Sequence, residues 1–206
     1  MGNKEYWNKV HNKYKNNDII YDNWLDEYKS LILFAQKPIL DLGCGLGNDT
    51  LYLRNLGLET ISLDYSEVAL NSLKENIKDV KTIKADISKP LDFKDSSFDL
   101  VVADLSLHYF DDKTTISIMH EIKRILTNGG HLIARVNSTK DINYGSSSQV
   151  EIEPNYLKVN DINKRFFTLV DAIKYFSIIG DVKVKEAVMY RYSKPKFVYE
   201  ILVEKI

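Results

Sequence analysis

The stretch Pro38–Thr50, PILDLGCGLGNDT, decides the fold. A short apolar run leads to Asp41, and glycines then occupy the alternate positions 43, 45 and 47. Glycine adopts positive φ at little cost and lets a ligand approach the backbone closely. A buried strand that enters such a turn and continues into a helix is typical of α/β proteins that bind nucleotide-like ligands. We therefore expect a strand before the glycines, a helix after them and a ligand against the turn.

The following segments repeat this alternation of strand and helix. Apolar runs bounded by turn residues predict strands at 37–43, 59–65, 80–86, 98–105 and 131–137. Amphipathic stretches between them predict helices at 48–57, at 66–77 with Ser66 as N-cap, and at 111–126, where 127–130 (TNGG) ends the helix. Such alternation predicts a parallel sheet with helices on both faces.

The last third of the chain departs from this alternation. Residues 138–165 are rich in Ser, Asn and Asp without a clear period, which predicts a long loop or insertion, of the kind that often serves as an active-site lid. A helix capped by Thr168 is expected at 168–180, and strands at 182–192 and 194–206 follow, joined closely enough to pair antiparallel. The fold class is therefore α/β, with a Rossmann-like, doubly wound, seven-stranded and mostly parallel sheet that ends in an antiparallel hairpin.

Length and composition limit the domain organisation and the partners. The 206 residues predict one domain, with a helical N-terminal cap (1–35), a ligand-binding core (36–136), the loop (138–165) and a C-terminal helix and hairpin (166–206). The 28 basic and 29 acidic residues give a net charge of −1, so we expect no nucleic-acid or membrane partner. Cys44 is the only cysteine, which precludes an intramolecular disulfide and fits a cytoplasmic location.

Aspartates stand at the ends of four successive predicted strands, at positions 41, 64, 86 and 104. The carboxyl ends of parallel strands form the ligand-binding edge of an open α/β sheet. Four acids there favour a ligand with hydroxyls, amines or positive charge. The dinucleotide fingerprint would need a third glycine where Asn48 stands, and Asp41 would repel a pyrophosphate, so a nicotinamide dehydrogenase is disfavoured.

Five segments together resemble the motifs of the class I S-adenosylmethionine-dependent methyltransferases. They are ILDLGCGLGNDT (39–50), SLDYSEVAL (62–70), IKADI (83–87), FDLVVADLSLHYF (98–110) and ILTNGGHLIARV (125–136). The last segment departs from the Lys-Pro-Gly-Gly that the family often shows, but it keeps both glycines. The resemblance implies an enzyme that uses S-adenosyl-L-methionine and releases S-adenosyl-L-homocysteine.

The same resemblance implies a set of cofactor-binding residues. Asp41 and the Gly43–Gly47 backbone would face the methionine portion, and Asp64 would accept both ribose hydroxyls. Tyr65 would lie near the adenine, with Asp86 at the adenine amine and Ile87 against the ring. Asp104 and Leu105 would lie beside the sulfonium. The full implied set is Asp41, Gly43, Cys44, Gly45, Gly47, Asp64, Tyr65, Asp86, Ile87, Asp104 and Leu105.

The acceptor side is less well defined by the sequence. His108 follows the fourth strand and is the candidate general base, with a packed or pocket-lining histidine as the alternative. Aromatic residues that are candidates for the substrate pocket or lid are Trp7, Tyr14, Tyr109 and Tyr144. The alternatives are helix anchors for the N-terminal pair and an exposed loop aromatic for Tyr144.

Neither the other three histidines nor any set of possible metal ligands adds a candidate site. His11, His120 and His131 are interpreted as structural or solvated, and no metal-ligand spacing is present, so no metal is expected.

The leading functional hypothesis is methyl transfer to a small-molecule acceptor. The segment after the fourth strand lacks the Asn-Pro-Pro-Tyr type of tetrapeptide that marks many enzymes methylating base or glutamine amines, and resembles a version common among small-molecule enzymes. The alternatives are a detoxifying methyltransferase with a sulfur or chalcogen acceptor, and a non-catalytic domain that binds S-adenosylmethionine. The acceptor and the oligomeric state stay open.

Overall fold

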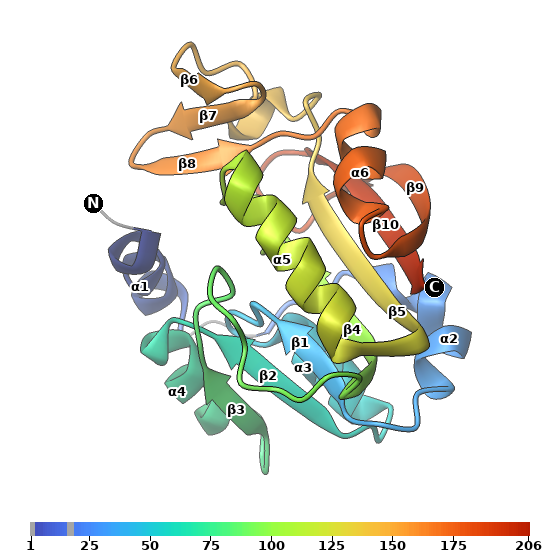
Figure 1. The fold of residues 1–206 in the computed structure, drawn as a ribbon. Helices are drawn as coiled ribbons and strands as arrows, with labels where there is room; N and C mark the ends of the chain where they lie inside the picture. The colour runs from blue at the N-terminus through green and yellow to red at the C-terminus, as the bar shows by residue number, and fades with distance from the viewer. Residues whose placement is uncertain (1–2, 16–18) are drawn as a thin grey trace.

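A computed structural model describes residues 3–15 and 19–206, and a seven-stranded sheet forms its centre (Figure 1). The strand order is β3-β2-β1-β4-β5-β10-β9, with parallel pairing from β3 to β5 and antiparallel pairing of β10 with both neighbours. This arrangement confirms the predicted fold class. The strands are β1 (Ile39–Leu42), β2 (Thr60–Asp64), β3 (Lys81–Lys84), β4 (Phe98–Asp104), β5 (Leu126–Asn137), β9 (Gly180–Met189) and β10 (Lys196–Lys205).

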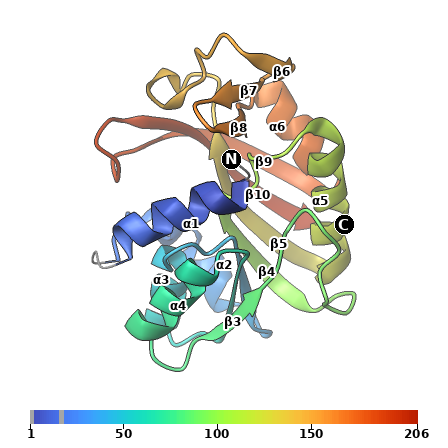
Figure 2. The same cartoon turned by 90° about the vertical axis from the view of Figure 1, so that its left-hand side faces the viewer.

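Helices cover both faces of the sheet (Figure 2). Side chains of β4 alternate between the faces, as a strand requires. Val101 and Ala103 pack into the core that contains α5 and α6, while Leu100 and Val102 pack with η1, α2 and α3. The helical elements are α1 (Asn3–Tyr14), η1 (Trp24–Tyr28), α2 (Lys29–Leu33), α3 (Asn48–Asn55), α4 (Glu67–Asn76), α5 (Asp112–Ile125) and α6 (Leu169–Phe176).

Two of the predicted helix starts are confirmed by their caps. The Ser66 hydroxyl accepts the Ala69 N–H at 3.3 Å at the start of α4. Thr168 and Asp171 form a reciprocal capping box at the start of α6, in which each side chain accepts a backbone N–H of the other residue. Such caps satisfy N–H groups that the first helical turn leaves without partners.

The prediction of a long loop at 138–165 is wrong. The segment contains η2 (Ile142–Tyr144) and a second, antiparallel sheet of β6 (Glu151–Glu153), β7 (Tyr156–Val159) and β8 (Ile162–Arg165), drawn at the top of Figure 1. These strands are only three or four residues long and largely polar, so they carry too little alternation for a sequence pattern to reveal them.

Two other predicted boundaries shift. The break expected at 127–130 lies within β5, which begins at Leu126 and pairs with β4 through a register irregularity between Phe98 and Leu100. The strand expected to reach Tyr192 ends at Met189. Residues 190–195 therefore form a longer loop between β9 and β10 than the sequence indicates, and this loop contributes to the site described next.

Candidate functional site

A pocket of about 1340 Å³ opens at the carboxyl edge of the parallel strands. The ends of β1, β2 and β4 form its floor, and α1, the small sheet and the β9–β10 loop surround it. Nearly every site residue expected from the sequence lines it: Trp7, Tyr14, Asp41, Gly43, Cys44, Gly45, Asp64, Tyr65, Asp86, Ile87, Asp104, Leu105, His108, Tyr109 and Tyr144. Gly47 is the exception among the residues expected there.

Two positions of the turn need glycine, because other side chains lie too close to them for a Cβ atom to fit. Gly43 has φ +80°, and a Cβ there would lie 2.4 Å from the Cβ of Ser106. Gly47 has φ +94°, and its added Cβ would lie 2.0 Å from Leu73 Cδ1 on α4. Gly43 thus keeps the pocket floor open against the loop after β4, whereas Gly47 serves the packing of α3 on α4.

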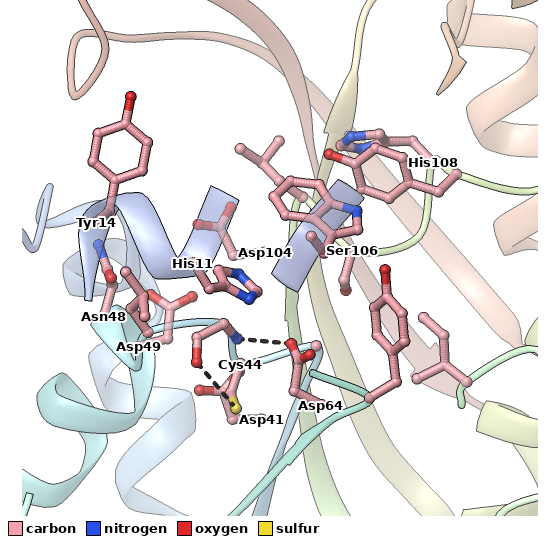
Figure 3. A pocket seen from close by; sticks show the side chains of 18 of the residues that line it. His11, Tyr14, Asp41, Cys44, Asn48, Asp49, Asp64, Asp104, Ser106 and His108 are labelled. Carbon is pink, nitrogen blue, oxygen red and sulfur yellow. Dashed lines mark hydrogen bonds between the residues drawn. The ribbon is translucent and has the colours of Figure 1, made fainter. Parts of the chain in front are cut away.

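Three buried carboxylates gather beneath the turn, on Asp41, Asp49 and Asp64 (Figure 3). Thr50 donates to Asp41 at 2.6 Å and the Trp24 indole N–H donates to Asp49 at 2.8 Å. Burial raises the pKa of Asp41 to about 7, with the neighbouring Asp104 and Asp64 adding to the rise.

The pKa values of the other two acids in this cluster are also raised. Burial raises the pKa of Asp49 well above its usual value, and it raises the pKa of Asp64 although Asp64 accepts the Gly45 N–H at 3.0 Å and the Ser66 N–H at 2.7 Å. Among residues 3–15 and 19–206, no Lys, Arg or His nitrogen pairs with these three carboxylates. The cluster is therefore electrostatically suited to a cationic ligand.

His11 on α1, interpreted from the sequence as structural or solvated, is not solvated and faces this cluster (Figure 3). It is buried, it lines the pocket, and its Nδ1 has no hydrogen-bond partner within the described part of the chain. Burial lowers its pKa against the opposing effect of Asp64. Trp7 precedes it by one helical turn, with ring centroids 5.5 Å apart. That i, i+4 spacing was the available signal that both side chains share one face.

Asp104 marks the middle of the pocket and is held by two arginines. Arg135 donates to it from Nε at 2.7 Å and from Nη2 at 2.8 Å, and Arg191 of the β9–β10 loop donates at 3.0 Å. Although burial opposes ionisation, Arg135 and Arg191 keep the pKa of Asp104 at about 2. Leu105 beside it has φ +54°, a left-handed backbone conformation that is uncommon for leucine.

His108 and Tyr109 lie beyond Asp104. The His108 side chain is 1% exposed, and its Nδ1 has no partner among the residues that the structure describes. Burial, followed by the charges of Lys196 and Lys164, lowers the pKa of His108 well below its usual value. Tyr109 packs against His108 and, edge to face, against Trp7, with centroids 4.3 and 5.2 Å apart. Burial raises the pKa of the Tyr109 hydroxyl, so both groups are uncharged at neutral pH.

Comparison with known proteins identifies the family. A family profile described as a methyltransferase domain matches residues 40–134. An uncharacterized methyltransferase of Synechocystis is 31% identical over 102 residues, which are 50% of this chain and 48% of that protein. Residues 40–134 therefore form a methyltransferase domain, and the chain is similar to the class I S-adenosylmethionine-dependent methyltransferases.

A second relative and a solved structure agree with this comparison. A wheat phosphoethanolamine N-methyltransferase is 26% identical over 142 residues, which cover 66% of this chain and 27% of that protein. The crystal structure of the PH0226 protein of Pyrococcus horikoshii superposes with a TM-score of 0.71 at 20% identity, covering 100% of both chains, which confirms the fold. The chain spans 48% of the length of the Synechocystis protein and 27% of the length of the wheat protein.

S-adenosylmethionine, the cofactor of this family, fits the acidic end of the pocket. It carries a positively charged ammonium and a sulfonium, and three buried carboxylates there have no cationic partner among the described residues. Asp64 lies at the end of β2, where the resemblance places the ribose, and each of its oxygens has a second lone pair to accept a hydroxyl.

Sequence reasoning missed several residues that line the pocket. Asp49 stands in the first turn of α3, where an acid is common because it complements the helix dipole, so nothing distinguished it. Lys164 of the small sheet and Arg191 and Tyr192 of the β9–β10 loop were missed because those segments were assigned differently. Lys196 was missed although its strand was predicted, because nothing in the sequence shows that the first residue of β10 lines the pocket. In the described part of the chain, no helix is long and apolar enough to cross a bilayer.

Proposed function

We propose that the protein transfers a methyl group from S-adenosylmethionine to a small-molecule acceptor by in-line displacement. When bound, the cofactor supplies an electrophilic methyl group on a positively charged sulfur. The observation that supports this proposal is one continuous pocket in which a cluster of buried carboxylates lies at one end and an aromatic-lined region at the other. A pocket of this kind can hold a cationic donor and a small acceptor together.

The residues of the acidic end bind and orient. Asp41 and the turn at Gly43–Gly45 would hold the methionine portion, and Asp64 the ribose hydroxyls. Tyr65 and Ile87 line the pocket where an adenine ring would lie between them. The binding work is thus done by side chains that the fold already fixes, because Thr50, Gly45 and Ser66 hold the carboxylates in place.

The residues around Asp104 exclude water and align the acceptor. Trp7 and Tyr109 close the pocket from α1 and from the loop after β4, and Tyr144 closes it from the small-sheet segment. Aromatic faces also attract a cation, which favours them beside a sulfonium. In a displacement reaction, alignment of the nucleophile and removal of water supply most of what the protein must contribute.

We assign His108 to the acceptor side of the pocket, as a hydrogen-bonding group rather than a strong base. An imidazole whose pKa lies well below 6.5 is uncharged at neutral pH, but it takes up a proton weakly. The same observation favours acceptors that need no deprotonation, which include neutral amines and soft sulfur or chalcogen nucleophiles. The wheat relative acts, by its name, on a small phosphorylated amine, which is consistent with a small acceptor here.

The test is a methyl-transfer assay with labelled S-adenosylmethionine and a panel of amine, hydroxyl and thiol acceptors. We expect acceptor-dependent formation of S-adenosylhomocysteine, with amines or thiols used better than alcohols. An exposed carboxylate variant, Asp92→Asn, is the matched control for buried-site variants. Cofactor binding without turnover against any acceptor class would instead indicate a non-catalytic binding domain and would overturn the proposal.

A further inference from the structure

We propose that Lys164, Lys196 and His108 form a binding site for an anionic group on the methyl acceptor, a phosphate or a carboxylate. This inference rests on the proposed function, because it identifies the class of acceptor that the same pocket takes. All three residues line the pocket, and His108 lies away from the carboxylates of Asp41 and Asp64 (Figure 3). They reach it from β8, from the start of β10 and from the loop after β4.

Most of the cations at this end of the pocket are paired with carboxylates. Lys196 is buried and donates to the buried Asp141 carboxylate at 2.8 Å, so these two charges cancel. Arg135 and Arg191 are likewise matched by Asp104 and Asp22. Lys164 also lines this end of the pocket, and it has no carboxylate partner among the residues that the structure describes.

Lys164 itself is partly buried and poorly satisfied. Its ammonium makes one long hydrogen bond, 3.4 Å to the Tyr144 carbonyl, and no carboxylate lies within 4 Å of it in residues 3–15 and 19–206. Burial, together with the charge of Lys196, lowers its pKa to about 8, and Asp141 opposes this effect only in part. A partly buried cation without a counter-ion is costly, and a ligand anion would remove that cost.

His108, the third residue of the site, can supply a hydrogen-bond donor to an anion. His108 is 1% exposed, it is near enough to Lys164 and Lys196 for their charges to act on it, and its Nδ1 is unpartnered in the described chain. Its uncharged ring can donate from one nitrogen to a phosphate or carboxylate oxygen. Two ammonium groups and one imidazole around the same space are a common set of donors for such anions.

One backbone hydrogen bond and one side-chain contact hold the segments of this site together. The Arg165 N–H donates to the His108 carbonyl at 2.7 Å, which ties β8 directly to the loop after β4. Lys196 Nζ lies 4.7 Å from the centroid of the Tyr144 ring, which places the η2 segment over the start of β10. The small sheet therefore has a role that a simple lid lacks, since it delivers the extra cation.

The pocket is thus divided by charge. The end beneath the glycine turn is acidic and suits the positively charged donor, whereas the end below the small sheet is basic and suits a negatively charged acceptor. The Asp104 charge reaches both ends, since it raises the pKa of Asp41 at one end and that of His108 at the other. A cationic acceptor without an anionic group would meet Lys164 and be disfavoured, so the same arrangement would also select against it.

The test uses the full chain saturated with S-adenosylhomocysteine, titrated with inorganic phosphate and, separately, with acetate, and followed by amide NMR shifts. We expect saturable shifts in residues of the site, and the probe that binds more tightly identifies the anion. Lys164→Met should weaken binding at least about tenfold. Lys158→Met is the matched control, because Lys158 is exposed on the neighbouring β7 and does not line the pocket, and its binding should be unchanged.

Several results would overturn this inference and leave the proposed function intact. They are S-adenosylhomocysteine binding with no saturable anion binding, and equal anion binding by Lys164→Met and the wild type. A third is weaker S-adenosylhomocysteine binding by Lys164→Met with no anion binding, which would assign the lysine to the cofactor's own carboxylate. Failure of the wild type to bind S-adenosylhomocysteine at all would instead refute the proposed function.

A second measurement does not depend on whether a variant folds. In wild-type protein at pH 8.5, the Lys164 side-chain carbon signal should move toward that of the ammonium form when phosphate is added, because an anion stabilises the charged amine against the effects of Lys196 and burial. No movement of that signal under saturating anion would contradict the inference.

Discussion

Replacing Asp41 by asparagine should make the free protein more stable and the cofactor complex weaker. The Asp41 carboxyl is buried at 2% exposure, and its folded-state pKa is raised from 3.8 to about 7. That rise corresponds to about 4 kcal/mol, at 1.36 kcal/mol for each pH unit. Asparagine has nearly the same shape and can still accept the 2.6 Å hydrogen bond from Thr50, so the charge is the main change.

The sign and the pH range of this effect follow from proton binding. The folded state holds the Asp41 proton more tightly than the unfolded chain, so wild-type stability falls as pH rises from about 4 to about 7. Asp41→Asn removes that fall. The variant should therefore match the wild type near pH 4 and exceed it by up to about 4 kcal/mol at pH 8.

The assay is urea unfolding at pH 4.5, 6 and 8, with cofactor binding measured on the same samples. Asp92→Asn, an exposed loop carboxylate, should show no such pH-dependent difference. S-adenosylhomocysteine should bind the Asp41→Asn variant about tenfold more weakly, because a charge-assisted contact to its ammonium is lost. A difference in stability that does not change with pH, or one that favours the wild type at pH 8, would refute the argument from buried charge.

Three further predictions concern the other end of the site and the frame around it. His108→Gln should keep kcat within about tenfold, and the wild-type kcat profile should show no ionisation of His108 between pH 6 and 8, because its pKa lies well below 6.5; a loss of more than a hundredfold would make it the base. Arg135→Met should cost about 3–5 kcal/mol in urea unfolding, since it leaves the buried Asp104 with Arg191 alone and the part-buried Asp22 without its arginine; no loss would contradict the burial argument. Thr168→Ala should cost about 1 kcal/mol by removing the capping box of α6, measured in the same way, and Thr139→Ala offers a comparison outside any helix cap.

The sheet and the acidic end of the pocket could be predicted because local patterns encode them. The glycine turn needs a backbone that only glycine provides at Gly43, and the apolar strands and amphipathic helices repeat at their own periods. Aspartates at strand ends converge because parallel strands share one edge. These features depend on a few neighbouring residues, and the sequence shows them directly.

The basic end could not be predicted, because it depends on contacts between distant segments. Lys164 lies on a strand of four residues whose alternation is too short to recognise. Lys196 lines the pocket at the start of β10, where it donates to Asp141, a residue 55 positions earlier in the chain. His11 looked like one more polar position on α1 until the fold placed that helix over Asp64. A single sequence gives no indication of which polar side chains tertiary packing brings together.

The most direct test of the central claim is isothermal titration of the full chain with S-adenosylhomocysteine, alongside Asp64→Asn. The account predicts binding at one site per chain, and at least about tenfold weaker binding by the variant, because asparagine offers one acceptor oxygen where the carboxylate offers two. Absence of binding by the wild type, or equal binding by both proteins, would contradict the assignment of this pocket to the methyl donor.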